Sequence, residues 1–232
     1  LPARGRQPRP RAGGGFAGVE LAGALNDFAR GMAADYLEID PAEIEIILIH
    51  ARERILPELS APLGDYALRR MTERGVTFRL GSRVADARPG VVVLSPDEEI
   101  QAETLVWTAG TAPNPLLKSL AVEKNGRGAL VVDDYLQIPS LPNCWALGDC
   151  AGVTDSRTRE ACPPTAQFAL REARTLAYNI HASMLGQKLK PFHFDSLGSL
   201  CVVGFQTACA ELTIPFFRKR KVQFSGLFAW LL

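Results

Sequence analysis

The sequence predicts an α/β fold with a mostly parallel sheet, and three observations lead to this prediction. Short apolar runs rich in β-branched residues alternate with longer segments of helical periodicity, which is the order of strand–helix–strand units. A glycine-rich turn over residues 13–18 opens the first of these helices. The 232 residues are 47% hydrophobic and 22% charged, so the chain resembles a soluble globular protein with a substantial core.

Charge and cysteine content exclude several classes of protein. Lys and Arg number 26 against 25 Asp and Glu, so there is no electrostatic basis for binding nucleic acid. No segment reaches the roughly 18 consecutive apolar residues of a membrane span. Five cysteines without a Cys-x-x-Cys pair argue against a disulfide framework, a zinc ribbon or a CxxC redox centre, and no metal site is predicted. A reducing, cytoplasmic type of environment is expected.

The first half of the chain reads as successive strands and helices. Residues 1–11 contain four Arg and three Pro and are predicted to be disordered. The elements expected after them are a helix to about Ala29, a buried strand over 43–49, a helix from Ser60 to about Arg74 that Gly75 ends, a strand over 76–80, a hairpin of 91–94 with 99–102, and a strand over 105–107.

A second compositional unit begins at Asn114. Strands are expected over 129–132 and 144–147, and the second ends in Gly148-Asp149. Pro163-Pro164 introduces a helix from about Thr165 to Leu185. Its predicted buried stripe consists of Ala166, Ala169, Leu170, Ala173, Ala177, Ile180 and Met184.

The glycine-rich turn matches the dinucleotide fingerprint G-x-G-x-x-G at Gly13, Gly15 and Gly18. The first glycine allows a tight turn, the second lets backbone approach a pyrophosphate, and the third lets helix meet strand. The pyrophosphate would then lie at the helix N-terminus. A plain glycine-rich turn is the alternative, because RQPRPRA stands where the fingerprint needs a strand. The strand that follows the helix favours the fingerprint.

That strand ends at His50. An acidic residue at this position would bind the adenosine ribose of NAD. A histidine there, with Arg52 and Arg54 close behind, would tolerate the 2′-phosphate of NADP, so the predicted ligand is NAD(P)H. The alternative, weighed equally, is a polar strand end without a ligand.

Five segments carry a family resemblance, in the order GGGFAGVELAGAL, ILPELSAPLGDYA, LVWTAGTAPNPLL, NCWALGDCA and PPTAQFALREA. Over residues 13–230 the chain resembles the type II NADH dehydrogenases, which are NADH:quinone oxidoreductases of the FAD/NAD(P)-binding pyridine nucleotide-disulfide oxidoreductase superfamily. Three features depart from that family. The GxGxxG half of the FAD unit is absent, the AGE motif reads Ala22-Gly23-Ala24, and the family's chain continues past Leu232. The resemblance therefore implies a partial chain.

The resemblance implies three regions. Residues 1–113 would form a Rossmann-like NAD(P)H-binding domain, and 114–186 the C-terminal part of a Rossmann-like FAD-binding domain. Residues 187–232 would be part of a membrane-facing tail. This tail combines aromatic and basic residues, as attachment to a membrane interface requires. They are Phe216, Phe217, the basic run 218–221 and the apolar end 227–232. A core strand with a solvated loop is the alternative.

The resemblance also implies residue roles. Gly110 and Gly148 would approach cofactor, and Asp149 would accept hydrogen bonds from the FAD ribityl chain. The helix start at Pro164, Thr165 and Ala166 would stabilise the negative charge of reduced flavin. Gln167, with Arg171 one turn on, would border the quinone pocket, and Glu20 would lie near the nicotinamide. The alternatives are a simple Gly-Asp turn, an ordinary amphipathic helix and a solvent-facing Glu20.

The function implied is hydride transfer from NAD(P)H to FAD, followed by electron transfer to a quinone. The chemistry would belong to the cofactors, while protein groups orient them and exclude water. The location implied is the cytoplasmic face of a membrane, and association into a homodimer is left open. Two alternatives remain: a non-catalytic remnant with residual nucleotide binding, and a disulfide reductase of the same superfamily.

Overall fold

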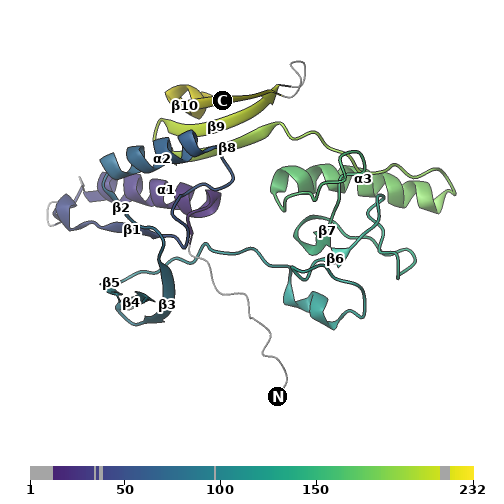
Figure 1. Ribbon diagram of the computed structural model, residues 1–232, viewed down its shortest axis with the longest axis horizontal. Coiled ribbons are helices and arrows are strands. Elements are labelled where there is room, and N and C mark those ends of the chain that lie inside the picture. Colours follow the sequence, from purple (N-terminus) through teal and green to yellow (C-terminus); the bar gives the residue numbers. More distant parts are fainter. Residues whose placement is uncertain (1–12, 34, 37–38, 97, 215–219) are drawn as a thin grey trace. The chain divides into compact units, whose positions relative to one another are not determined.

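The computed structural model describes residues 13–33, 35–36, 39–96, 98–214 and 220–232, so the expectation for residues 1–11 lies outside the described part of the chain. The described residues form two compact units (Figure 1). The first contains those of Leu1–Gly110 and Leu197–Leu232, and the second is Thr111–Ser196. The sequence placed boundaries after 113 and 186 and expected a separate region from 187 onward. In the structure, residues from Leu197 instead pack with the first unit, because their apolar side chains complete its core.

A parallel strand pair with a helix in the connection confirms the α/β class. Strand β1 (Ile46–Ile49) pairs in parallel with β2 (Val76–Arg79), and helix α2 (Ala61–Glu73) joins them. Helix α1 (Phe16–Ala33) precedes β1. A 3₁₀ turn at Pro41–Glu43 occupies the start of the predicted strand, so β1 is shorter than expected.

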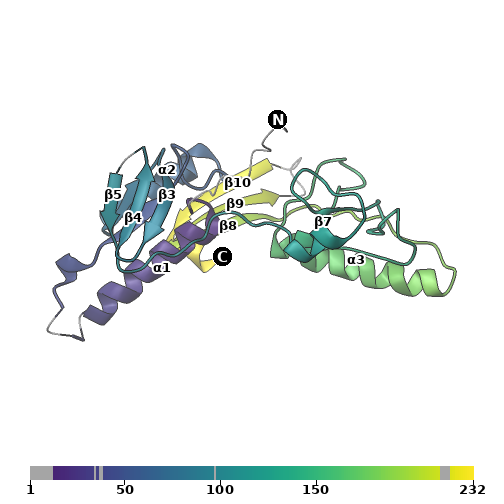
Figure 2. The same ribbon diagram turned by 90° about the horizontal axis from the view of Figure 1, so that it is seen from below.

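A small antiparallel sheet of β3 (Arg83–Arg88), β4 (Val91–Ser95) and β5 (Glu98–Gln101) follows in that order (Figure 2). The pairing of β4 with β5 confirms the predicted hairpin. Strand β3 was not predicted, because half of its side chains are polar, five of the six are exposed, and the apolar ones do not alternate regularly with the polar ones.

The strand expected over 105–107 does not form. Leu105, Val106 and Trp107 belong to no sheet and are 42%, 51% and 45% exposed. A strand needs a neighbour to satisfy its backbone groups, and among the described residues β1 pairs with β2 alone. The apolar composition of the segment was therefore a misleading signal.

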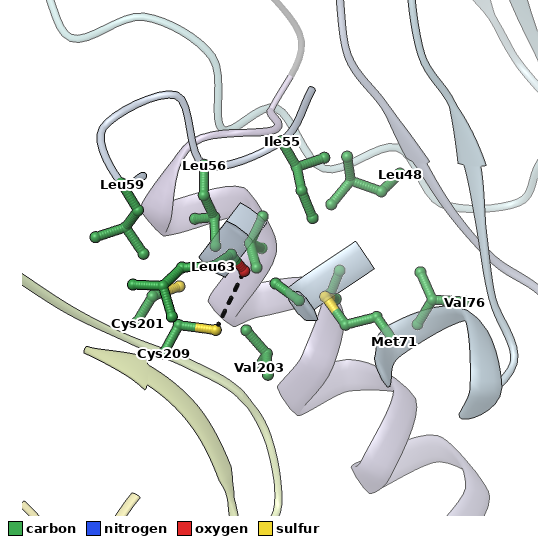
Figure 3. Packing of buried hydrophobic residues seen from close by; sticks show 13 residues of the cluster. Leu48, Ile55, Leu56, Leu59, Leu63, Met71, Val76, Cys201, Val203 and Cys209 are labelled. Atoms are coloured by element: carbon green, nitrogen blue, oxygen red, sulfur yellow. Dashed lines mark hydrogen bonds between the residues drawn. The ribbon is translucent and has the colours of Figure 1, made fainter. Parts of the chain in front are cut away.

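The C-terminal residues form a second antiparallel sheet, in the order β10-β9-β8. Its strands are β8 (Gly198–Gly204), β9 (Thr207–Ile214) and β10 (Arg220–Gly226), and helix α4 (Leu227–Leu231) ends the chain. Cys201, Val203 and Cys209 face the core shared with α1 and α2 (Figure 3). Ala208 and Ala210, at alternate positions, pack with Ala229 of α4 on the opposite face. Of the predicted tail, Phe216, Phe217 and the first two residues of the basic run, 218–219, lie outside the described residues, and residues 220–231 form a strand and a helix.

The two core cysteines act as packing residues. The Cys209 thiol donates to the Leu63 carbonyl oxygen at 3.5 Å (Figure 3). Burial raises the pKa of Cys209 to about 11, and burial, together with neighbouring Glu20, raises that of Cys201 further. Both thiols therefore stay protonated and poorly nucleophilic at neutral pH.

The second unit is built around one long helix. Strands β6 (Leu130–Val131) and β7 (Ala151–Gly152) pair in parallel, and α3 (Ala166–Met184) packs on a core that includes Leu136, Phe168 and Phe192. Short 3₁₀ helices lie at Pro115–Ser119 and Gly148–Cys150. The strand expected over 144–147 is reduced to a single bridge between Gln137 and Trp145.

The buried face of α3 differs from the predicted stripe. The buried residues are Phe168, Glu172, Asn179 and Ala182, whereas Leu170 is 66% and Met184 79% exposed. Asn179 is buried because its side-chain amide donates to the carbonyls of Tyr135 and Lys190 and accepts from the Lys190 N–H. Polar side chains on this face thus serve the backbone of neighbouring loops, which apolar periodicity does not reveal.

Candidate functional site

The three fingerprint glycines form a tight loop at the N-terminus of α1. A Cβ on Gly18 would overlap the Gly13 carbonyl oxygen, and a Cβ on Gly13 would overlap the Thr108 Oγ1. The Gly15 carbonyl accepts from the Val19 N–H at 3.0 Å, which starts the helix directly after the loop. Close backbone approach therefore requires glycine at position 18, and the Thr108 side chain requires it at position 13, as the fingerprint demands.

His50 supports this loop from the end of β1. Its Nδ1 accepts a hydrogen bond from the Gly14 N–H at 3.2 Å, and the residue is only 6% exposed. A Cβ on Gly14 would meet the imidazole ring. Because Nδ1 accepts, the proton of the neutral ring lies on Nε2. The sequence suggested that His50 contacts the adenosine ribose of the nucleotide. In the structure His50 also holds the glycine loop through its bond to Gly14.

The two arginines after His50 differ in their surroundings. The Arg54 guanidinium donates to the Leu59 carbonyl at 3.5 Å, within its own loop. Arg52 is exposed. Of the two, Arg52 is thus better placed to meet an added phosphate.

Glu20 lies on α1, but its carboxylate is directed to the C-terminal sheet. Its Oε1 accepts from the Val202 N–H of β8 at 3.2 Å. Asp27, two turns on, likewise accepts from the Phe205 N–H and pairs with Arg74. The acids on α1 therefore join the helix to β8 and the turn that follows it.

In the second unit, Gly148 and Asp149 begin the short 3₁₀ turn before β7. Gly148 has a φ of +62°, a left-handed conformation that favours glycine. Its N–H donates to the Glu172 Oε2 at 2.7 Å. Asp149 is exposed beside it. The Gly-Asp pair is therefore held against α3 with its carboxylate open to a ligand.

Glu172 is a residue that the sequence reasoning missed. It is 3% exposed, and burial raises the pKa of its carboxyl, against the lowering effect of the Gly148 N–H; the nearby Asp149 charge raises it further. The sequence did contain a signal for the buried face of α3, since its buried residues follow helical spacing; they are Phe168, Glu172, Asn179 and Ala182. A search for apolar periodicity did not find this face because two of the four residues are polar.

The start of α3 lies next to the Gly-Asp turn. Thr165 and Ala166 are exposed, and the Thr165 side chain makes no capping hydrogen bond. The Gln167 Oε1 accepts from the Ser196 hydroxyl at 3.2 Å. The Arg171 guanidinium lies 5.3 Å from the centre of the Phe194 ring.

The structure thus gathers the predicted residues into two groups. The first unit brings Gly13, Gly15 and Gly18 together with His50, while the second brings Gly148 and Asp149 to the helix start at 164–167. Gly110, with a φ of +82°, ends the first of the two segments that make up the first unit. No cluster of His, Cys, Asp or Glu able to hold a metal ion occurs among the described residues. None of the described helices combines the length and apolarity that crossing a bilayer requires.

Comparison with known proteins gives a family match over most of the chain. Residues 11–173 match the family model of the pyridine nucleotide-disulphide oxidoreductases. A type II NADH:quinone oxidoreductase of Haemophilus influenzae is 32% identical over 219 residues, which are 94% of this chain and 49% of that protein. A mitochondrial internal alternative NAD(P)H-ubiquinone oxidoreductase of Arabidopsis thaliana is 28% identical over 235 residues, which are 95% of this chain and 45% of that protein.

A solved structure shows the same fold. NDH2 of Plasmodium falciparum, in complex with NADH, superposes with a TM-score of 0.79 at 18% identity, covering 94% of this chain and 59% of that one. The chain spans about half the length of the curated relatives that it matches.

Proposed function

Since the chain belongs to the pyridine nucleotide-disulphide oxidoreductase family, we propose that it takes part in hydride transfer from NAD(P)H to FAD and in electron transfer onward to a quinone. One observation carries the proposal: the Gly13–Gly18 contact at the N-terminus of α1, which leaves no room for side chains between loop and helix. The names of the NADH:quinone oxidoreductase relatives support the choice of substrates.

NAD(P)H would bind at the glycine loop. The backbone N–H groups of the loop and the positive end of the α1 dipole favour a pyrophosphate there. Gly13, Gly15 and Gly18 permit the approach, and His50 holds Gly14 in place. Arg52 would meet the 2′-phosphate of NADPH. Glu20, proposed near the nicotinamide, would also position the loop through its contact with β8.

FAD would bind at the Gly-Asp turn, and the residues present fit it. An exposed carboxylate at Asp149 suits ribityl hydroxyl donors, and left-handed Gly148 keeps the turn free of a side chain. The exposed helix start at Pro164, Thr165 and Ala166 would favour the charge of reduced flavin. When bound, FAD would accept the hydride and release electrons singly or in pairs. Gln167 and Arg171 would orient the quinone.

Quinone access suggests a peripheral position on a membrane, at its cytoplasmic face. Support comes from apolar side chains exposed on α4 and the β8–β9 turn. Phe205 is 63%, Phe228 59% and Leu231 68% exposed. Such side chains could enter the interfacial region without spanning the bilayer.

The test separates the nucleotide site from general folding defects. Gly18→Val should abolish NADH binding, measured by nucleotide fluorescence, because its side chain would displace the loop. Gly31→Ala, on the same helix with nothing within 4 Å, is the matched control and should bind normally. Asp149→Ala should lower FAD retention and FAD-dependent reduction of a short-chain quinone, and leave NADH binding unchanged. Equal NADH binding by the Gly18 variant and its control would refute the nucleotide site.

A further inference from the structure

Glu172 is a buried carboxylate to which the proposed redox reaction assigns no part. It lies on the inner face of α3 between Phe168, one turn before it, and the partly buried Leu176, one turn after it, and both of these pack in the core of the second unit. Only 3% of Glu172 is exposed. Burying an acid among apolar side chains is costly unless its oxygens find hydrogen-bond donors.

The donor that Glu172 finds belongs to the turn proposed to hold FAD. The Glu172 Oε2 accepts from the Gly148 N–H at 2.7 Å, which ties α3 to a residue 24 positions earlier in the chain. The φ of +62° at Gly148 sets the direction in which the backbone enters Asp149. Glu172 therefore fixes the backbone that carries the exposed Asp149 carboxylate, although Glu172 itself is buried.

Two effects favour the protonated form of Glu172. Burial raises the pKa of its carboxyl against the lowering effect of the Gly148 hydrogen bond, and the negative charge of Asp149 raises it further. The two acids are thus coupled, and a change at Asp149 is felt at Glu172.

The other titratable neighbours of Glu172 do not supply a compensating charge. Cys162 stays a neutral thiol at neutral pH, because burial and nearby carboxylates raise its pKa to about 11. The guanidinium of Arg171, next to Glu172 in the chain, lies 5.3 Å from the centre of the Phe194 ring. Asp149 is therefore the charged neighbour to which Glu172 responds.

FAD at the turn would strengthen the coupling between the two acids. Ribityl hydroxyls on Asp149 would displace the water that screens its charge, and charges interact more strongly as the local dielectric constant falls. Two ionised carboxylates in such a site repel, so that one of them takes a proton. Asp149 stays ionised as the acceptor of the ribityl hydrogen bonds, which leaves Glu172 to be protonated. The proton would lie on Oε1, because Oε2 remains the acceptor for the Gly148 N–H.

We propose that Glu172 is a positioning residue of the FAD site, and that it takes up a proton from solvent when FAD covers Asp149. It acts through the Gly148 N–H, which Oε2 can bind in either protonation state. The inference rests on the proposed function, since it requires FAD at the Gly-Asp turn. It adds a link between cofactor affinity and pH, because binding that consumes a proton weakens as the pH rises.

The test is isothermal titration calorimetry of FAD binding to the full chain between about pH 5 and 8, in buffers of different ionisation enthalpy that reveal proton uptake. The wild-type chain should take up a proton, and its Kd should rise by at most about tenfold per pH unit. Glu172→Gln keeps an acceptor for the Gly148 N–H and has no proton to gain, so its Kd should match the wild type at low pH and stay constant. Glu160→Gln removes an exposed carboxylate of the same unit and, as the matched control, should behave like the wild type.

A second substitution tests the positioning role. Glu172→Leu leaves the Gly148 N–H without its acceptor, so FAD should bind roughly tenfold more weakly than to Glu172→Gln, as for one lost hydrogen bond. The Gly148 amide signal in NMR spectra gives a readout without FAD. It should shift with pH in the wild-type chain as Glu172 titrates, and stay fixed in Glu172→Gln.

The outcomes separate this inference from the proposed function. Equal proton uptake by the wild type and Glu172→Gln, or the same pH response of the Gly148 signal in both, would overturn the role of Glu172 and leave the FAD site in place. A wild-type chain that binds no FAD would refute the FAD site itself, and the proton uptake with it.

Discussion

Asp155 illustrates, at the residue scale, how the fold controls a carboxylate. The residue is 5% exposed, and its oxygens accept from the backbone N–H groups of Arg157, Thr158 and Phe194 and from His193 at 2.7 Å. Burial raises the pKa, but the three backbone hydrogen bonds and that of His193 outweigh it and lower the pKa to about 2. Asp195, on the other ring nitrogen of His193, adds a second acid to the cluster.

This lowered pKa predicts acid sensitivity. The carboxylate stabilises the fold above the unfolded pKa of 3.8, and that stability is lost as the pH falls toward 2. Asp155→Asn should lower the free energy of unfolding at pH 7 by roughly 1–2 kcal/mol and flatten its fall between pH 4 and 2. Urea unfolding at several pH values measures both. Asp134→Asn, which breaks an exposed pair with Arg159, is the control and should change little.

Glu172 should respond to pH in the opposite sense. Burial raises its pKa, so the ionised carboxylate is disfavoured in the fold and stability falls as the pH rises above the unfolded value of 4.5. Glu172→Gln keeps an acceptor for the Gly148 N–H and should raise the free energy of unfolding at pH 8. Glu172→Leu leaves that N–H unpaired and should lower it by about 1–3 kcal/mol. If both variants moved stability in the same direction at pH 8, the Gly148 contact would not be the reason for the burial of this acid.

At the scale of elements, the packing of α1 on β8 depends on one glycine. A Cβ on Gly23 would lie 2.8 Å from the Val203 carbonyl carbon and 3.0 Å from the Gly204 nitrogen, both of them backbone atoms. Because a backbone cannot rotate away as a side chain can, Gly23→Ala should destabilise the first unit by about 1–3 kcal/mol. Gly31→Ala has open space and should stabilise the helix by roughly 0.5–1 kcal/mol. Thermal unfolding measures the melting temperatures of the two variants side by side. A shift of both melting temperatures in the same direction would contradict this account.

At the scale of the whole molecule, the C-terminal sheet and α4 make the membrane proposal testable by point substitution. Removing residues after 215 would take β10 and α4 from a folded sheet, so the exposed side chains are better targets. Phe228→Ser with Leu231→Ser should reduce co-sedimentation with anionic liposomes, since each fully buried side chain contributes roughly 1.5–3 kcal/mol. Leu116→Ser, also well exposed, is the control. If the double variant and the wild type pelleted equally, α4 would take no part in the proposed membrane contact.

Local chemistry was enough to predict much of the first unit. The glycine loop, α2 with Gly75 at its end, the strands around it and the β4–β5 hairpin follow from backbone preferences and short-range periodicity. The Gly-Asp turn also followed from its residues, because Gly followed by Asp at the end of an apolar run is typical of a turn. The sequence by itself therefore determined the α/β class and the loops proposed to bind cofactors.

Long-range contacts decided the rest. Residues 105–107 are apolar enough for a strand, yet they join no sheet in the described structure, because strand formation depends on a neighbour. The buried face of α3 was decided by Gly148, Tyr135 and Lys190, whose backbone groups bind Glu172 and Asn179. The packing of β8 and the turn after it on α1 joins residues more than 170 positions apart. Burial and hydrogen bonding between distant segments are properties of the assembled chain, so only the tertiary structure could show them.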